Sequence, residues 1–148
     1  MTARQCSMQD VLIDRDRFVK AVVDRIQGIA AKLIPEIKVP LDFHNTLQRR
    51  VADMASQFGF MGVREYPVYN AEVGVEGLAD VAWMAKKRLT AVFEIDSSPR
   101  MKSVQKLIAL DAPFRFWVYY GHLHYLSMVR SVDKGNAIEV IRLRNVYF

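Results

Sequence analysis

Three acidic residues stand among apolar residues in two neighbouring segments of this chain. In the stretch AVFEIDSSP, Glu94 and Asp96 interrupt an apolar run, and Asp80 stands within GLADVAWM. Side chains two residues apart on a strand point to the same face, so Glu94 and Asp96 should lie side by side. Because burying an unpaired charge is costly, these acids need a cationic partner.

Asp80 joins the other two acids if the two segments form a hairpin. The intervening AKKR is of hairpin length, and a three-residue loop in which Ala85 pairs with Leu89 places Asp80 opposite Glu94. A two-residue loop would place Asp80 opposite Phe93, facing the other way. We expect the first register because it gathers the acids on one side. Three carboxylates so placed predict a divalent ion with oxygen ligands, Mg²⁺ or Mn²⁺.

A divalent ion beside lysines on a basic protein indicates phosphodiester chemistry. The ion can polarise a phosphodiester and help to deprotonate an attacking water, and a lysine can stabilise the added charge on the phosphate. Lys102 and Lys106 follow the acids and lie one turn apart on one face of an expected helix. The net charge of +5 favours a polyanionic partner such as nucleic acid.

The segments that must position these residues alternate between helical and strand patterns. We expect helices over residues 14–34, 42–58 and 98–110, and strands over 62–70, 77–84, 89–96, 114–121 and 137–144, with residues 122–132 open between the two. Asp42 and Ser98 are the expected N-caps, and Gly59 the expected helix stop. The strand–helix–strand step over residues 89–120 predicts a parallel crossover. The fold class is therefore a mixed α/β sheet with helices on its faces.

The chain resembles the PD-(D/E)XK nuclease superfamily, which includes restriction enzymes and Holliday-junction resolvases. The resemblance lies in the element order, in Asp80 of LADVAW, and in FEID, where Glu94 is followed two residues later by Asp96. The resemblance covers roughly residues 42–121. It implies a restriction-endonuclease-like αβββαβ core over residues 42–148, with residues 1–40 as an N-terminal helical extension of the same single domain, 1–148. It also implies that Asp80 and Glu94 ligate the metal. Asp96 stands where the family has its catalytic lysine. Family variants carry this lysine on the following helix, which makes Lys102 and Lys106 the two candidates here; we favour Lys106, although the sequence alone does not decide between them.

Three further residues bear on the resemblance. Many members carry a Glu on the helix before the sheet, where this chain offers His44 and Gln48. Glu65, on the first expected strand, could supply an additional oxygen ligand.

His122 and His124 have no third ligand within reach in the sequence, so we expect them in a loop rather than in a metal site.

Three functions remain open from the sequence. The first is a Mg²⁺- or Mn²⁺-dependent nuclease acting on DNA, with Asp80 and Glu94 on the metal, Asp96 assisting by ligation or hydrogen bonding, and Lys106 or Lys102 stabilising the transition state. The second is a nucleic-acid-binding module that lost turnover with the family lysine. The third is a structural α/β domain with a protein partner, in which basic residues pair with the acids and the first helix forms a homodimer surface.

The composition excludes several other classes. The single cysteine, Cys6, excludes an intramolecular disulfide framework and a multi-cysteine zinc site. No apolar run approaches the ~20 residues that span a bilayer, and the opening MTARQCSMQD lacks the apolar region of a signal peptide. We therefore expect a cytoplasmic protein with no membrane partner. Cys6 has no ordered base nearby to activate it as a nucleophile.

Overall fold

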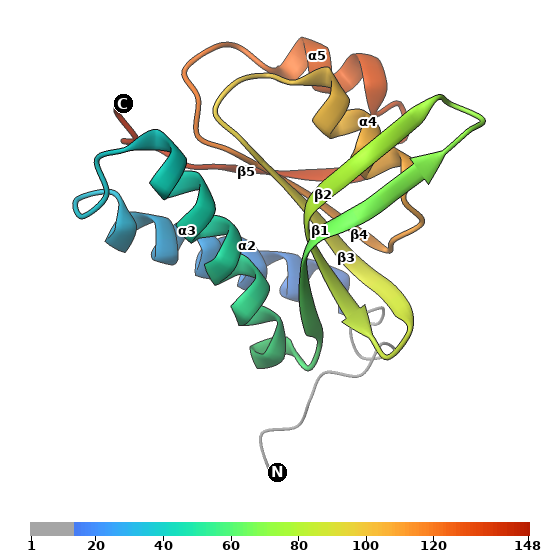
Figure 1. Ribbon diagram of the computed structural model, residues 1–148, viewed down its shortest axis with the longest axis horizontal. Helices are drawn as coiled ribbons and strands as arrows, with labels where there is room; N and C mark the ends of the chain where they lie inside the picture. The colour runs from blue at the N-terminus through green and yellow to red at the C-terminus, as the bar shows by residue number, and fades with distance from the viewer. Residues whose placement is uncertain (1–13) are drawn as a thin grey trace.

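The computed structural model describes residues 14–148, which form a five-stranded sheet with helices on both faces (Figure 1). The helices are α2 (Arg15–Leu33), α3 (Pro40–Asp53), α4 (Met101–Ala109) and α5 (Leu126–Val132), with a 3₁₀ turn η1 (Met54–Phe58) after α3. The strands are β1 (Met61–Asn70), β2 (Val75–Ala85), β3 (Arg88–Asp96), β4 (Phe114–Tyr119) and β5 (Ile138–Arg142). The mixed α/β class is confirmed. The expectations for Cys6 and for MTARQCSMQD concern residues outside the described range.

The strands follow one another across the sheet in the order β1-β2-β3-β4-β5. β1–β2 and β2–β3 are antiparallel, whereas β3–β4 and β4–β5 are parallel. Helix α4 joins β3 to β4, so the predicted parallel crossover is confirmed. From α3 to β4 the main elements run helix, strand, strand, strand, helix, strand. Within residues 14–148, no helix combines the length and the apolar character needed to cross a membrane.

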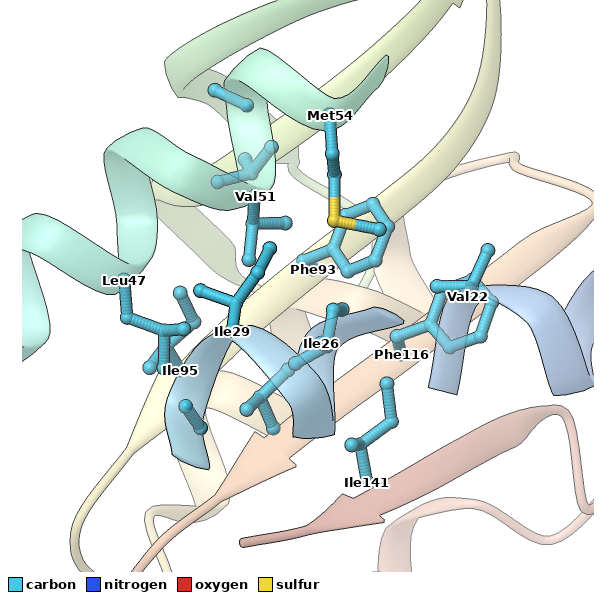
Figure 2. Close-up of a cluster of buried hydrophobic side chains, with 14 of the residues drawn as sticks. Val22, Ile26, Ile29, Leu47, Val51, Met54, Phe93, Ile95, Phe116 and Ile141 are labelled. Atoms are coloured by element: carbon cyan, nitrogen blue, oxygen red, sulfur yellow. The ribbon is translucent and has the colours of Figure 1, made fainter. Parts of the chain in front are cut away.

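Helices α2 and α3 cover one face of the sheet and form the larger core with it (Figure 2). The apolar stripe of α2 is buried there. Its residues recur every three or four positions and so share one side of the helix: Phe18, Val22, Ile26, Ile29 and Leu33. The central contacts join the two helices and η1 to β3, β4 and β5, through Val22, Ile26, Ile29, Leu47, Val51, Met54, Phe93, Ile95, Phe116 and Ile141.

Helices α4 and α5 cover the opposite face (Figure 1). Val104 and Leu107 of α4 pack there against Trp117 and Tyr119 of β4, together with Ala79 of β2. Both faces of the central strands are therefore buried, as the nearly continuous apolar sequence of β4 predicts. The acids of β3 are held between two packed layers.

Two helix starts differ from the predictions. Helix α3 begins at Pro40 after Val39, so Asp42 lies in its first turn and is not the N-cap. Proline suits this position because the first helical N–H has no partner in any case, and an acid in the first turn favours the positive end of the helix dipole. Helix α4 begins at Met101, because Arg100 is still extended; the predicted N-cap at Ser98 was wrong.

Two other boundaries bear out the sequence patterns. The chain leaves η1 through Gly59, whose φ of 84° is left-handed, so the predicted stop is confirmed. Residues 122–132 divide into a loop, which contains His122 and His124 as expected, and helix α5.

Candidate functional site

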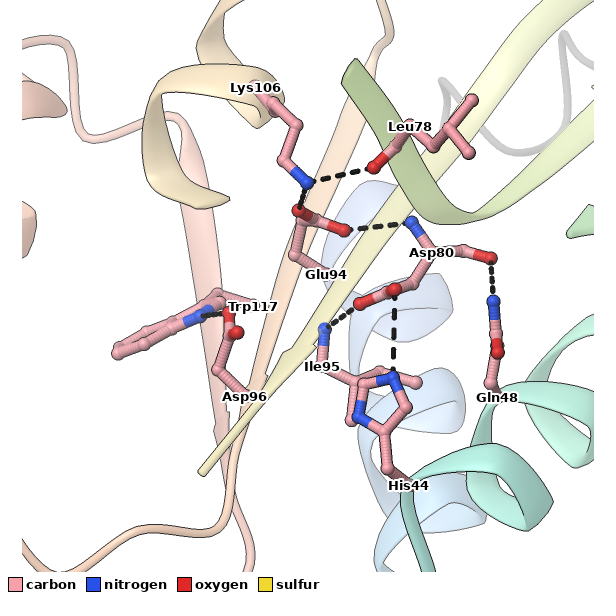
Figure 3. A network of polar contacts seen from close by, with 9 residues as sticks. All are labelled: His44, Gln48, Leu78, Asp80, Glu94, Ile95, Asp96, Lys106 and Trp117. Atoms are coloured by element: carbon pink, nitrogen blue, oxygen red, sulfur yellow. Dashed lines mark hydrogen bonds and ion pairs between the residues drawn. The ribbon is translucent and has the colours of Figure 1, made fainter. Parts of the chain in front are cut away.

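Asp80 lies at an irregularity where β1 and β2 pair. Glu65 and Asp80 are not paired in the β1–β2 ladder, although the register is the same on both sides of them, and Glu65 has a left-handed φ of 55°. Val81 packs into the α2/α3 core, whereas Ala79, two residues earlier, packs on the α4 side. The regular alternation of β2 therefore breaks at Asp80. The Asp80 carboxylate extends toward β3, where it accepts the Ile95 N–H (Figure 3).

The register of β2 with β3 places Asp80 beside Glu94. Val81 pairs with Phe93 and Ala82 with Val92, which is the predicted alignment. The predicted three-residue loop was wrong, because Ala85 pairs with Arg88 around a two-residue tip. A register shift between Trp83 and Met84 compensates for the shorter loop. The alignment is thus confirmed, although it arises by a different route.

Beyond Val81, carboxylates replace the ladder bonds between β2 and β3 (Figure 3). Glu94 Oε2 accepts the Asp80 N–H at 2.8 Å, and Asp80 Oδ2 accepts the Ile95 N–H at 2.7 Å. From α3, Gln48 Nε2 donates to the Asp80 carbonyl oxygen at 2.9 Å. Each acid therefore holds the backbone of the other's strand, which fixes the two carboxylates relative to one another.

The remaining oxygen of each carboxylate faces a basic side chain. Lys106 Nζ lies 2.5 Å from Glu94 Oε1 and also donates to the Leu78 carbonyl oxygen at 2.8 Å. His44 Nε2 lies 3.7 Å from Asp80 Oδ1. Lys106 comes from α4 and His44 from α3, so helices on opposite faces of the sheet direct basic groups at one pair of acids (Figure 3).

Burial and mutual repulsion set the protonation of this pair. Burial of Glu94, helped by the charge of Asp80, raises the pKa of Glu94 to about 8, although Lys106 opposes the shift. Burial would also raise the pKa of Asp80, but His44 and the Ile95 N–H together hold it below its usual value. Asp80 in turn raises the pKa of His44. The pKa values of the two acids are therefore shifted in opposite directions, because the site stabilises one negative charge better than two.

Asp96 does not join the other two acids. Its Oδ2 accepts the indole N–H of Trp117 at 2.9 Å. Burial raises the pKa of Asp96, while hydrogen bonds from Ser103 and Trp117 act in the opposite direction. The structure therefore brings together two of the three predicted acids and gives the third polar partners of its own.

The other predicted residues divide in the same way. Lys106 reaches Glu94, whereas Lys102, also on α4, is exposed. Glu65 is not at the acid pair but lines a neighbouring groove. His44 and Gln48 are on the expected helix, but the sequence gave no sign that both would contact Asp80. The Leu78 carbonyl was missed, because a backbone acceptor leaves no mark in side-chain types.

The acid pair offers a small set of ligands for a metal. Among residues 14–148, no group of three or more His, Cys, Asp or Glu side chains is placed to hold a metal ion. Asp80 Oδ1 and Glu94 Oε1 are the two oxygens that the backbone does not engage. Mg²⁺ commonly keeps several waters and takes one or two protein carboxylates. The pair therefore fits a hydrated Mg²⁺ or Mn²⁺ ion. Such an ion would have to displace Lys106 from Glu94 Oε1.

No family model, no curated protein and no solved structure matches this chain. Its function must be inferred from the residues themselves. The buried junction of Asp80 and Glu94, with Lys106 and His44 directed at it, is the feature that calls for a chemical explanation.

Proposed function

We propose that this protein is a metal-dependent nuclease whose active site is the junction of Asp80 and Glu94. The observation that supports it most is the pair of carboxylates on adjacent strands, each anchored to the other's backbone and faced by a basic side chain. A divalent ion would neutralise both acids, whereas Lys106 forms an ion pair with Glu94 and not with Asp80. The order of elements from α3 to β4 agrees with the restriction-endonuclease-like core that the FEID and LADVAW motifs suggest.

Each residue has a distinct role in this proposal. Bound Mg²⁺ or Mn²⁺ supplies a Lewis acid that polarises the phosphodiester of a nucleic acid, here proposed to be DNA. Asp80 and Glu94 hold the ion, and their bonds to the Ile95 and Asp80 N–H groups keep the two carboxylates in place. Lys106 pairs with the negative charge that grows on the phosphate in the transition state.

His44 and Asp96 position the metal-binding acids in this account. His44 stabilises the ionised form of Asp80, since its raised pKa favours a charged imidazole beside that carboxylate. Asp96 fixes the end of β3 against Trp117 of β4. We assign neither residue a contact with the substrate.

Cleavage of plasmid and branched DNA with Mg²⁺ or Mn²⁺ tests this function. We expect nicking that EDTA abolishes and that Asp80→Ala and Glu94→Ala each reduce by at least about a hundredfold. Glu76→Ala is the matched control, because Glu76 is an exposed acid on the same strand as Asp80. Undiminished cleavage by either Asp80→Ala or Glu94→Ala would contradict the proposal. A parent protein that cleaves no DNA with Mg²⁺ or with Mn²⁺ would contradict it as well.

A second candidate is a nucleic-acid-binding module without turnover. It is favoured by one observation: all four oxygens of the acid pair already face protein donors, so the junction is satisfied without a metal. Salt-sensitive strand binding without cleavage would identify this second function.

A further inference from the structure

A polar groove of about 500 Å³ adjoins the acid pair, between α3 and β1. Gln48 connects the two sites, because it lines the groove and donates to the Asp80 carbonyl oxygen. Asn45 and Thr46 add neutral polar groups from α3. The groove is thus a polar surface that is separated from the proposed site of cleavage by the Gln48 side chain alone.

Two arginines line this groove from different elements. Arg49 comes from α3 and Arg64 from β1, and both are exposed. Within residues 14–148, neither guanidinium makes a hydrogen bond or an ion pair. Three other arginines of the fold, Arg15, Arg115 and Arg142, each donate to a backbone carbonyl. Arg49 and Arg64 therefore retain their full donor capacity for an external ligand.

The backbone of β1 contributes to this arrangement. Arg64 pairs with Val81, whose side chain belongs to the α2/α3 core, so Arg64 faces the α3 side of the sheet. The next residue, Glu65, has a left-handed φ of 55° and is not paired with Asp80 in the β1–β2 ladder. A left-handed conformation is strained for a non-glycine residue, and such strained residues concentrate at functional sites. The unpaired position of the ladder therefore adjoins both Asp80 and the groove, since Glu65 lines the groove.

We propose that this groove binds the sugar–phosphate backbone of a nucleic acid strand, with Arg49 and Arg64 each contacting a phosphate. Guanidinium groups suit phosphate because their paired N–H donors match two phosphate oxygens. Asp42 and Glu65 also line the groove and oppose this attraction. Removal of either negative charge should therefore tighten binding. The proposal that the groove leads the substrate strand to the acid pair rests on the proposed nuclease function. Strand binding by the groove requires no metal.

Fluorescence anisotropy in EDTA, with labelled single-stranded DNA, duplex DNA and RNA, tests the groove without cleavage. Arg49→Ala and Arg64→Ala should each weaken binding by about fivefold at low salt and lower the slope of log K against log salt by about 1. Glu65→Gln should strengthen binding. Arg64→Lys should keep the slope, since it retains the charge.

Arg50→Ala is the matched control. Arg50 follows Arg49 on α3 but lines the groove between α2 and α3, so its loss should leave strand binding unchanged. Equal weakening by Arg50→Ala and Arg49→Ala would reveal general attraction to the basic protein and overturn the proposal. Competition by inorganic phosphate or a mononucleotide as effective as that by the strand would also overturn it, because a small-anion site would then explain the arginines.

The two proposals fail in distinguishable ways. Arginine-dependent strand binding without cleavage would leave the groove in place and remove the nuclease function. Cleavage that depends on Asp80 and Glu94 but is indifferent to Arg49 and Arg64 would do the reverse. Failure to bind any strand overturns the groove. Melting curves that match the parent protein would show that the exposed arginine substitutions leave the fold intact.

Discussion

Glu94 is the acid whose charge its surroundings accommodate least. Its side chain is 2% exposed, and the carboxylate of Asp80 lies against the same strand junction. Burial and Asp80 together raise its pKa to about 8, beyond what Lys106 can offset. The carboxyl group of Glu94 therefore keeps its proton near neutral pH, and binding of a divalent cation would favour its ionised form.

The raised pKa makes stability depend on pH. Glu94 binds its proton more tightly in the folded state, with a pKa near 8 against 4.5 in the unfolded chain, so the stabilisation is fully present below pH 4.5 and is lost as the pH rises through 8. The raised pKa of His44 acts in the same direction above pH 6.5. Urea unfolding between pH 5 and 8 should show stability falling with pH, with Glu94 alone contributing about 1.4 kcal/mol per pH unit. Glu94→Gln should flatten the profile; a flat or rising profile in the parent protein would refute this reading.

Lys106 occupies a position that a metal ion must contest. Lys106→Met keeps much of the side-chain length and removes the charge, so Mg²⁺ should bind roughly tenfold more tightly at pH 8.5 in the absence of DNA. Cleavage should nevertheless fall, because the transition state loses a cation. Isothermal calorimetry measures the first effect, with Lys102→Met as the exposed control on the same helix. An unchanged Mg²⁺ affinity in Lys106→Met would show that the ammonium does not compete.

At the scale of elements, the site depends on how closely α3 approaches the sheet. His44 and Gln48 reach Asp80 from this helix, and Gly62 of β1 permits the approach: a Cβ at Gly62 would lie 1.9 Å from the carbonyl oxygen of Ala52. The contact is with backbone, which cannot move aside as a flexible side chain would. The spacing between helix and strand is therefore set by a residue with no role in the chemistry.

Alanine substitutions at two glycines test this spacing. Gly62→Ala should destabilise the fold by about 2 kcal/mol or more by forcing α3 away from β1. Gly28→Ala, inside α2, should stabilise it by about 1 kcal/mol, because a Cβ there meets nothing within 4 Å and alanine favours the helix. Denaturant unfolding measures both effects. A neutral Gly62→Ala would show that α3 can shift at little cost.

The elements themselves could be predicted because their signals are local. The apolar stripe of α2 and the turn at Gly59 depend on neighbouring residues alone. The break at Asp80 could not be predicted in this way, since a glutamate, and no glycine, takes the left-handed position at Glu65. The start of α4 was misplaced because Ser98 and Pro99 are typical of a helix start, whereas here the chain stays extended through Arg100.

At the scale of the whole molecule, the acid pair lies where three layers meet. The α2/α3 layer supplies His44 and Gln48, the sheet supplies Asp80 and Glu94, and the α4/α5 layer supplies Lys106. Sequence patterns predicted that Asp80 and Glu94 lie together, because one hairpin register determines it, and they left Lys102 and Lys106 as two candidates on one helix face. The convergence of both helical layers could not be predicted, since it depends on packing between segments far apart in the chain.

The most direct test of the central claim is a crystal of the protein soaked in Mn²⁺ and measured for anomalous scattering. We expect a Mn²⁺ peak about 2.1 Å from oxygens of both Asp80 and Glu94, with the Lys106 ammonium displaced from Glu94. No peak at saturating Mn²⁺, with Lys106 still on Glu94, would show that the lysine alone balances these acids and would contradict the account.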